Sequence, residues 1–389
     1  CIKFKFSPKL VKNMGFKPKV YFTSNVFTPS EIGSNNKINQ KIRDNINKLW
    51  EMLNNIAELK IFTGRFPTEA ELKGDIEEFI PDLIGCHLSH KISANILNRS
   101  KIFAICTSTA GYNHIQKTQN DDILITHTPG VLHETVADYT IALIMANLRN
   151  LIDLHKNVWN GNWSTTNKWD MDQSLSSVIS NKILGIVGLG EIGKEVVKRL
   201  YPWGVKILYY DILRMKEFEK VYPNIGFKDK MEEIFQESDI ISLHIPLNKF
   251  TEKIINKDLL KLMKKDALLV NTARGLLLDF ESLLDLLEKK EIQINLALDV
   301  FPTEPLDVKT LKRLNKIKKI QPELRILLLP HNASADADTR GKMNIMFLKD
   351  IIKIIESKSL EDLKEIHLIP EQKSEISKKN WRIYNYWKN

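Results

Sequence analysis

The stretch that decides the fold is Ile183–Gly193, which reads ILGIVGLGEIG. It begins like a buried strand, and beyond its last glycine apolar residues recur at helical spacing as far as Leu200. Between strand and helix lie the glycines of a GxGxxG pattern: Gly188, Gly190 and Gly193. The first allows a tight turn, the second lets a pyrophosphate approach the backbone, and the third lets helix and strand pack closely. The turn, with Glu191 and Ile192 at the helix start, is therefore predicted to bind the phosphates of a dinucleotide.

The choice between NAD(H) and NADP(H) depends on Asp211. This residue ends the next predicted strand, 18 residues after Gly193. A carboxylate at this position binds the adenosine ribose hydroxyls and repels a 2′-phosphate. We therefore expect NAD(H). The nearby positive charge of Arg214 reduces this preference, so NADP(H) is the alternative.

The glycine turn has two rival explanations. Gly188–Lys194 also fits GxxxxGK, the start of a triphosphate-binding P-loop, but Glu195 stands where that loop needs a hydroxyl group for magnesium. A carboxylate would repel the triphosphate, which argues against a P-loop. A glycine turn without any ligand stays open, although the strand, the helix and Asp211 all favour a dinucleotide.

Two series of α/β elements surround this motif. In the first third, strands are expected at 20–23, 102–108 and 123–126, and a helix at 45–59. A long helix is expected at 134–150. Six further strands, mostly separated by helical segments, are expected at 183–187, 205–210, 240–245, 267–270, 292–298 and 326–329. Strands with such crossovers predict a doubly wound parallel sheet.

The expected organisation is two doubly wound parallel-sheet domains, with a larger Rossmann domain inserted into a smaller flavodoxin-like domain. The helix expected at 339–355 returns to the first domain, which makes that domain discontinuous. We place the smaller, substrate-binding domain at 18–130 and 333–375 and the dinucleotide-binding domain at 131–332. Residues 1–17 and 376–389 are expected to be tails.

Polar residues follow successive strands of the second series. Arg274 follows 267–270, Asp299 and Glu304 follow 292–298, and His331 follows 326–329. Reduction of a 2-keto acid needs a cation for the carboxylate and carbonyl, an acid that protonates the alkoxide, and a group that orients the acid. Singly, each residue has an ordinary structural explanation. Their occurrence at successive carboxyl ends, where doubly wound sheets bind ligands, favours a catalytic site.

These motifs, taken in order, cover nearly the whole chain: 107–114, 128–138, the glycine turn, 244–247, 272–275, 299–305 and 330–331. In this set the chain resembles the D-isomer-specific 2-hydroxyacid dehydrogenases. Residues 270–275, the pair Thr339-Arg340 and residues 369–371 are most similar to glyoxylate/hydroxypyruvate reductases of fungal type. Two departures concern the substrate more than the catalysis: Asn332 stands where an apolar residue is usual, and Asn295-Leu296 replaces small residues.

The resemblance implies hydride transfer between NAD(P)H and a small 2-keto acid, with glyoxylate or hydroxypyruvate favoured and a D-2-hydroxy acid as product. It implies Arg274 as the substrate-binding arginine, His331 as the acid/base and Glu304 as its partner. The amides of Ala110 and Gly111 would also hold the substrate carboxylate. The implied cofactor contacts beyond the glycine turn are Asp211, Ile245, Pro246, Thr251, Thr272, Ala273, Arg274 and Asp299, the last at the nicotinamide carboxamide.

The resemblance also implies a homodimer. The alternative function is a corepressor-like protein that senses nicotinamide dinucleotides without significant turnover. Activity towards any 2-keto acid would separate the two.

Composition excludes several other classes. The net charge is +9, but lysines are spread along the chain, so no nucleic-acid partner is expected. No apolar stretch is long enough for a membrane span. Three cysteines without a CxxC pattern predict a reducing, cytoplasmic location and no metal site. Residues 1–13 are either a basic targeting segment, which would indicate mitochondria, or precede the true start at Met14, the hypothesis that we favour.

Overall fold

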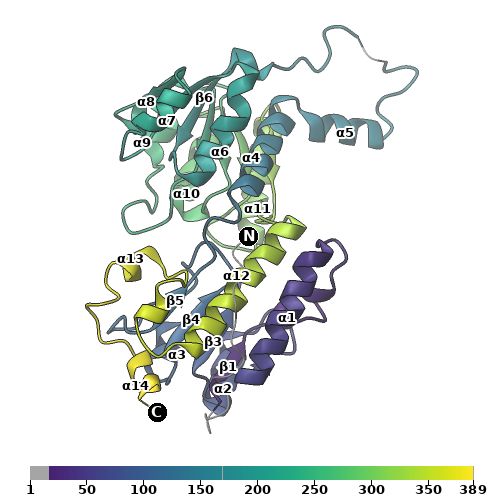
Figure 1. The fold of residues 1–389 in the computed structure, drawn as a ribbon. Coiled ribbons are helices and arrows are strands. Elements are labelled where there is room, and N and C mark those ends of the chain that lie inside the picture. The colour runs from purple at the N-terminus through teal and green to yellow at the C-terminus, as the bar shows by residue number, and fades with distance from the viewer. Residues whose placement is uncertain (1–16, 169, 389) are drawn as a thin grey trace. The chain divides into compact units, whose positions relative to one another are not determined.

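The computed structural model describes residues 17–168 and 170–388, which form two compact units. Unit 1 comprises residues 17–132 and 336–388, and unit 2 comprises residues 133–335 apart from residue 169. Each unit contains one parallel β-sheet with helices on both faces (Figure 1). This arrangement confirms the predicted fold class. The predictions for residues 1–13 and Met14 lie outside the described residues.

The sheet of unit 1 has the strand order β2-β1-β3-β4-β5. Its strands are β1 (Lys19–Phe22), β2 (Glu58–Ile61), β3 (Leu83–Cys86), β4 (Ala104–Thr107) and β5 (Leu124–Thr126). All neighbouring strands are parallel, with Val20 opposite both Leu59 and Leu83. This is the flavodoxin-like order.

Alternation along β1 explains how unit 1 builds a core on both faces of its sheet. Val20 and Phe22 face α1 (Gln40–Ile56) and α12 (Ala337–Glu356), which lie side by side in Figure 1. Tyr21 faces the opposite cluster, which includes residues of α2 (Glu69–Phe79) and α3 (Ala94–Asn98). Successive side chains of a strand point to opposite faces, so this one strand anchors both layers.

The C-terminal stretch corrects one prediction. Residues 376–389 were predicted to be a tail, but Trp381 is 1% exposed and Ile383 is 0% exposed in the core of unit 1. The short helix α14 (Ile383–Trp387) lies within this stretch, and α13 (Pro370–Lys373) precedes it. Arg382 fixes the stretch through an ion pair with Asp122 and hydrogen bonds to backbone carbonyl groups. Burial of aromatic side chains is the physical reason that this segment folds back.

The sheet of unit 2 has the order β12-β11-β10-β9-β6-β7-β8, with all strands parallel. Its strands are β6 (Ile183–Val187), β7 (Lys206–Tyr210), β8 (Ile225–Phe227), β9 (Ile240–Leu243), β10 (Leu268–Asn271), β11 (Asn295–Leu298) and β12 (Ile326–Leu328). The order reverses between β6 and β9, as in a Rossmann fold. Ligands of such sheets bind at the carboxyl ends beside this switch point.

Helices cover both faces of this second sheet. One buried cluster includes residues of α4 (His133–Leu148) and α6 (Glu191–Leu200), and the other includes residues of α8 (Met231–Glu237), α9 (Lys257–Leu262), α10 (Phe280–Glu288) and α11 (Val308–Ile320). The helix α7 (Lys216–Val221) follows β7. The long helix was expected at 134–150, close to the bounds of α4.

Three strands were not predicted: β2, β3 and β8. Each has only three or four residues. β2 mixes charged and apolar residues at the edge of its sheet, and β3 contains Gly85, whose missing side chain leaves room for Phe22 and Phe347. Such short strands lack the apolar run or alternation from which a strand is predicted.

The helix α5 (Leu151–Trp159) has no buried residue, unlike the other long helices of unit 2. Figure 1 shows α5 and the chain that follows it leading away from the sheet of that unit. In the described part of the chain, no helix has the length and hydropathy to cross a membrane. The same residues contain no cluster of His, Cys, Asp and Glu suited to a metal ion.

Candidate active site

The glycine turn after β6 has the geometry that a phosphate site requires. Gly188 has φ +97°, and a Cβ there would lie 2.8 Å from the carbonyl oxygen of His244. A Cβ on Gly193 would lie 2.3 Å from the carbonyl oxygen of Gly188, so helix and turn touch through their backbones. A Cβ on Gly190 would meet no atom within 4 Å. The turn is therefore packed tightly on the protein side and open at Gly190, as binding of a pyrophosphate requires.

Asp211 lies beside this turn at the end of β7. Its Oδ2 accepts a hydrogen bond of 2.7 Å from the amide of Leu189, and its Oδ1 accepts one of 3.3 Å from the amide of Leu213. The carboxylate is thus tied to the glycine turn itself. Ribose hydroxyls are the ligands that an acid at this position binds in NAD sites.

The segment after β9 also reaches the glycine turn. The position of a Cβ on Gly188 would be 2.7 Å from Cγ2 of Ile245. Pro246 and Thr251 are linked, because the Thr251 hydroxyl donates to the carbonyl oxygen of Pro246 at 2.6 Å. Three predicted cofactor contacts therefore belong to one local structure beside the phosphate turn.

Arg274 follows β10 in a turn that Asn271 organises. The Asn271 side chain is fully buried; its Oδ1 accepts from the amide of Ala273 at 3.0 Å and its Nδ2 donates to the carbonyl oxygen of Arg274 at 2.9 Å. Behind the turn, a Cβ on Gly275 would lie 1.9 Å from the carbonyl carbon of Phe301, so only glycine fits. The turn is fixed from two sides. This role of Asn271 was not predicted, although the residue lies in the segment 270–275, which contributes to the family resemblance.

The side chain of Arg274 retains unused hydrogen-bonding capacity. Its Nη1 donates to the carbonyl oxygen of Ala273 at 2.6 Å, while its buried Nε has no partner among the described residues. Burial lowers the pKa of Arg274, and the nearby Glu304 carboxylate acts in the opposite direction. A buried donor without a partner is costly unless a ligand supplies the acceptor.

His331 and Glu304 form the central pair of the site. His331 Nδ1 lies 2.6 Å from Glu304 Oε2, and the two side chains are 24% and 33% exposed. The other carboxylate oxygen, Oε1, accepts from the amide of Phe301 at 2.9 Å. Burial raises the pKa of Glu304, but hydrogen bonds from His331 and Phe301 and the charge of Arg274 outweigh it, so the net shift is downward. An ionised carboxylate on Nδ1 leaves Nε2 as the nitrogen that can exchange a proton with a ligand.

Asp299 shapes the backbone that carries His331. Its carbonyl oxygen accepts from the amide of His331 at 2.8 Å, and its carboxylate accepts from the amides of Asn332 at 2.9 Å and Ala333 at 2.8 Å. His331 itself has φ +54°, a conformation that costs energy for a residue with a side chain. The Tyr139 hydroxyl approaches Asp299 Oδ1 at 3.4 Å. Tyr139 was not predicted, because a tyrosine within a helix gives no signal of this contact.

The predicted substrate loop of unit 1 follows β4. The Thr109 hydroxyl donates to the carbonyl oxygen of Gly111 at 2.6 Å, and His127 Nδ1 lies 2.7 Å from the carbonyl oxygen of Ala110. Burial lowers the pKa of His127. Both contacts are made to the backbone carbonyl oxygens of Ala110 and Gly111, whereas the predicted substrate contacts are the amides of these two residues.

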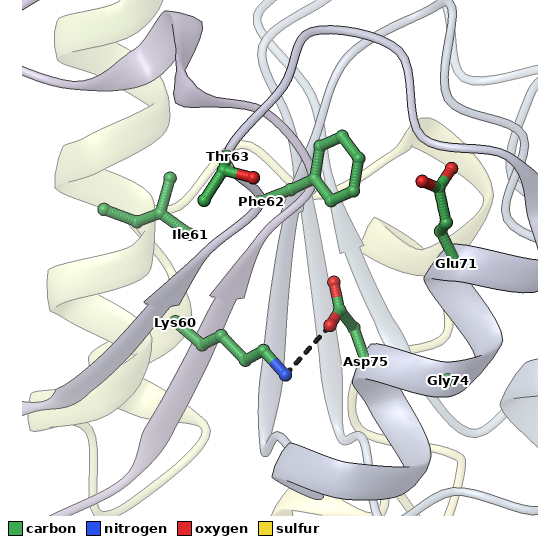
Figure 2. Close-up of a pocket in the computed structure, with 7 residues that line it drawn as sticks. All are labelled: Lys60, Ile61, Phe62, Thr63, Glu71, Gly74 and Asp75. Atoms are coloured by element: carbon green, nitrogen blue, oxygen red, sulfur yellow. Dashed lines mark ion pairs between the residues drawn. The ribbon is translucent and has the colours of Figure 1, made fainter.

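A separate pocket in unit 1 contains none of the predicted site residues. It lies beside β2 and α2, and Figure 2 shows its lining: Lys60, Ile61, Phe62, Thr63, Glu71, Gly74 and Asp75. Lys60 is paired with Asp75 at 2.9 Å within it. The pocket is therefore distinct from the candidate active site, whose residues follow the carboxyl ends of the strands.

Comparison with known proteins identifies the family. Residues 141–333 match the domain family described as "D-isomer specific 2-hydroxyacid dehydrogenase, NAD binding domain". A glyoxylate reductase from Thermofilum pendens is 36% identical over 292 residues, which are 74% of this chain and 82% of that protein. The chain belongs to the D-isomer-specific 2-hydroxyacid dehydrogenase family. It is therefore an NAD(P)-dependent oxidoreductase.

A second relative and a solved structure are also similar to this chain. A glyoxylate reductase from Korarchaeum cryptofilum is 35% identical over 271 residues, 68% of this chain and 77% of that protein. The crystal structure of a protein from Thermus thermophilus has a TM-score of 0.69 at 27% identity, covering 90% of this dehydrogenase chain and 99% of the other.

Proposed function

We propose that this dehydrogenase reduces glyoxylate or hydroxypyruvate with NADH. The observation that carries the proposal is the His331–Glu304 pair at 2.6 Å, with the charge of Arg274 acting on the same carboxylate. An acid, its orienting carboxylate and a cation are the groups that reduction of a 2-keto acid requires. The similar glyoxylate reductases support glyoxylate as a substrate.

Arg274 is the proposed substrate-binding residue. Its buried Nε and the rest of its guanidinium offer donors to the carboxylate and the keto oxygen of a 2-keto acid. The positive charge also stabilises the oxygen as it becomes an alkoxide. Ala110 and Gly111 keep their proposed role as substrate-binding residues.

His331 is the proposed acid in reduction and the base in oxidation. Glu304 holds Nδ1, so the proton on Nε2 passes to the alkoxide oxygen when the carbonyl is reduced. The negative charge of Glu304 stabilises the imidazolium before this transfer. When bound, the reduced nicotinamide supplies the hydride that reaches the keto carbon.

The residues proposed to hold the cofactor are those around the glycine turn and the ends of the neighbouring strands. Gly188, Gly190 and Gly193 fit this role, because the turn is packed against backbone atoms at Gly188 and Gly193 and open at Gly190. The remaining proposed contacts are Glu191, Ile192, Asp211, Ile245, Pro246, Thr251, Thr272, Ala273, Arg274 and Asp299. Asp211 supports NAD(H) over NADP(H), because its charge would repel a 2′-phosphate.

A second copy of this chain is the proposed partner of the segment 151–178. Eight large apolar side chains there are between 43% and 80% exposed: Leu151, Ile152, Val158, Trp159, Trp163, Met171, Leu175 and Val178. Exposed apolar surface of this extent is typical of an interaction site. We expect sedimentation to give a dimer for the parent protein and a monomer for Trp159→Glu. A monomeric parent would rule out this assignment.

A cytoplasmic location is part of the proposal. Cys86 and Cys106 are buried thiols without a disulfide, as in a reducing compartment.

The proposed function is tested with a panel of 2-keto acids, each assayed with NADH and with NADPH. Glyoxylate and hydroxypyruvate should be reduced fastest, and NADH should give the higher kcat/KM. Hydroxypyruvate is the informative substrate for stereochemistry, since it should give the D-isomer, whereas the product from glyoxylate is achiral. A protein that binds NADH but reduces none of these acids would instead be a corepressor-like sensor.

A further inference from the structure

Arg214 is the cation closest in sequence to the ribose-binding acid. It lies three residues after Asp211, on the loop between β7 and α7. An arginine near this acid is the group with which Rossmann folds bind the 2′-phosphate of NADP(H). From position alone, this chain could therefore accept NADPH despite Asp211.

The structure shows this arginine engaged by a carboxylate. Arg214 Nε donates to both oxygens of Glu219 at 3.0 and 3.1 Å, and Nη2 donates to Oε2 at 2.9 Å. The guanidinium carbon also lies 5.4 Å from the ring centre of Phe227. A guanidinium held through two nitrogens and stacked on a ring is restricted in its orientation.

Glu219 is anchored from the interior of unit 2. The Tyr209 hydroxyl donates to Glu219 Oε1 at 2.6 Å, and the same hydroxyl accepts from the amide of Met215 at 2.9 Å. Tyr209 is fully buried in β7, and the Glu219 side chain is 17% exposed, against 52% for Arg214. The carboxylate is therefore the fixed partner, and it determines where the more exposed arginine lies.

We propose that Glu219 is a specificity-determining residue that withholds Arg214 from a 2′-phosphate. While the Arg214–Glu219 ion pair is intact, the negative charge of Asp211 determines which cofactor binds, and it selects NADH. When the Glu219 charge is removed, Arg214 gains the freedom to bind the phosphate of NADPH. The inference rests on the proposed cofactor site at Gly188–Asp211.

The inference is tested without turnover by measuring the direct binding of NADH and NADPH through the fluorescence of the reduced nicotinamide. Glu219→Gln should lower the Kd for NADPH by about tenfold, the size of one charge-assisted contact to phosphate. Its Kd for NADH should stay within about twofold of the parent value, since no 2′-phosphate is present. In the double variant Glu219→Gln/Arg214→Ala, the Kd for NADPH should return to the parent value.

Glu217→Gln is the matched control. Glu217 lies on the same helix, is 85% exposed and pairs with Lys220, so its replacement changes the net charge equally without touching Arg214. This control should leave both Kd values unchanged. If Glu219→Gln does not fold, Tyr209→Phe is the second variant: it removes the anchor of Glu219 and should move the Kd for NADPH in the same direction by a smaller factor.

Three outcomes would overturn the inference. One is a Glu219→Gln protein that folds and binds NADH normally but shows no gain in NADPH binding. Another is a loss of NADPH binding of about tenfold in Arg214→Ala alone, since the arginine would then already bind the phosphate. A parent protein that binds neither dinucleotide would overturn the proposed function, and this inference with it.

Discussion

Replacing Glu304 with glutamine should impair catalysis by forcing a choice between two hydrogen bonds. In the parent, Oε1 accepts from the Phe301 amide and Oε2 faces His331 Nδ1. If the glutamine oxygen keeps the Phe301 contact, its NH2 group faces Nδ1, which must then accept and gives up its proton. If the amide turns over, its NH2 group faces the Phe301 N–H, and two donors oppose each other. The first arrangement is incompatible with an imidazolium, and the second accepts its Nδ1 proton but lacks the carboxylate charge and opposes two donors.

The expected loss follows from the charge on this pair. A hydrogen bond to a charged group contributes roughly 1.5–3 kcal/mol. Partial exposure of both side chains, 24% and 33%, reduces this to about 1–2 kcal/mol. We therefore expect kcat for reduction to fall on the order of tenfold.

The assay is the pH profile of kcat with NADH and hydroxypyruvate for the parent, Glu304→Gln and Glu323→Gln. Glu323 is exposed and bonded to Gln293, so its variant makes the same chemical change elsewhere. The Kd for NADH should be similar in all three proteins. A Glu304→Gln profile that overlays the parent would refute the role assigned to this carboxylate.

Three other changes have expected outcomes. In steady-state kinetics, Arg274→Ala should both raise KM for the keto acid and lower kcat, because the cation contacts both the substrate and the alkoxide. A change in KM alone would mean that Arg274 acts only in substrate binding. The pKa of Glu304 is lowered in the folded protein, so the ionised carboxylate stabilises the fold above the pKa of the unfolded chain, and this stabilisation is lost as pH falls through the folded pKa. The Tm of Glu304→Gln should therefore lie below that of the parent near neutral pH and converge with it in acid. A Tm difference that stays constant with pH would contradict this. Trp381→Ala should lower the free energy of unfolding by about 3–5 kcal/mol in denaturant titrations, because the side chain is 1% exposed; a loss below about 1 kcal/mol would mean that the segment contributes little to the core.

The parts of this structure that the sequence predicted are those with strong local patterns. β6 has the predicted bounds, because an apolar run is followed at once by glycines whose spacing has a specific backbone use. The catalytic candidates could be predicted because each follows a strand. Their pairing was a further step, since His331 and Glu304 are 27 residues apart in the chain.

Other features depend on tertiary contacts that no local pattern encodes. Trp381 lies in a stretch rich in lysine and asparagine, and its burial depends on a surface formed by distant segments. Asp299 was predicted only as a ligand contact, and the hydrogen bonds that its carboxylate accepts from the amides after His331 join residues more than 30 positions apart in the chain. The Arg214–Glu219 pair depends on side-chain directions at the start of α7, so the position of Arg214 alone could not reveal it.

The central claim is that His331 transfers the proton in reduction of a 2-keto acid. The most direct measurement compares kcat for hydroxypyruvate reduction by the parent and by His331→Ala at saturating NADH, with the Kd for NADH measured alongside. The account predicts a loss in kcat on the order of 10²–10⁴, the usual contribution of general acid catalysis, with NADH binding little changed. A His331→Ala protein that reduces hydroxypyruvate as fast as the parent would contradict it.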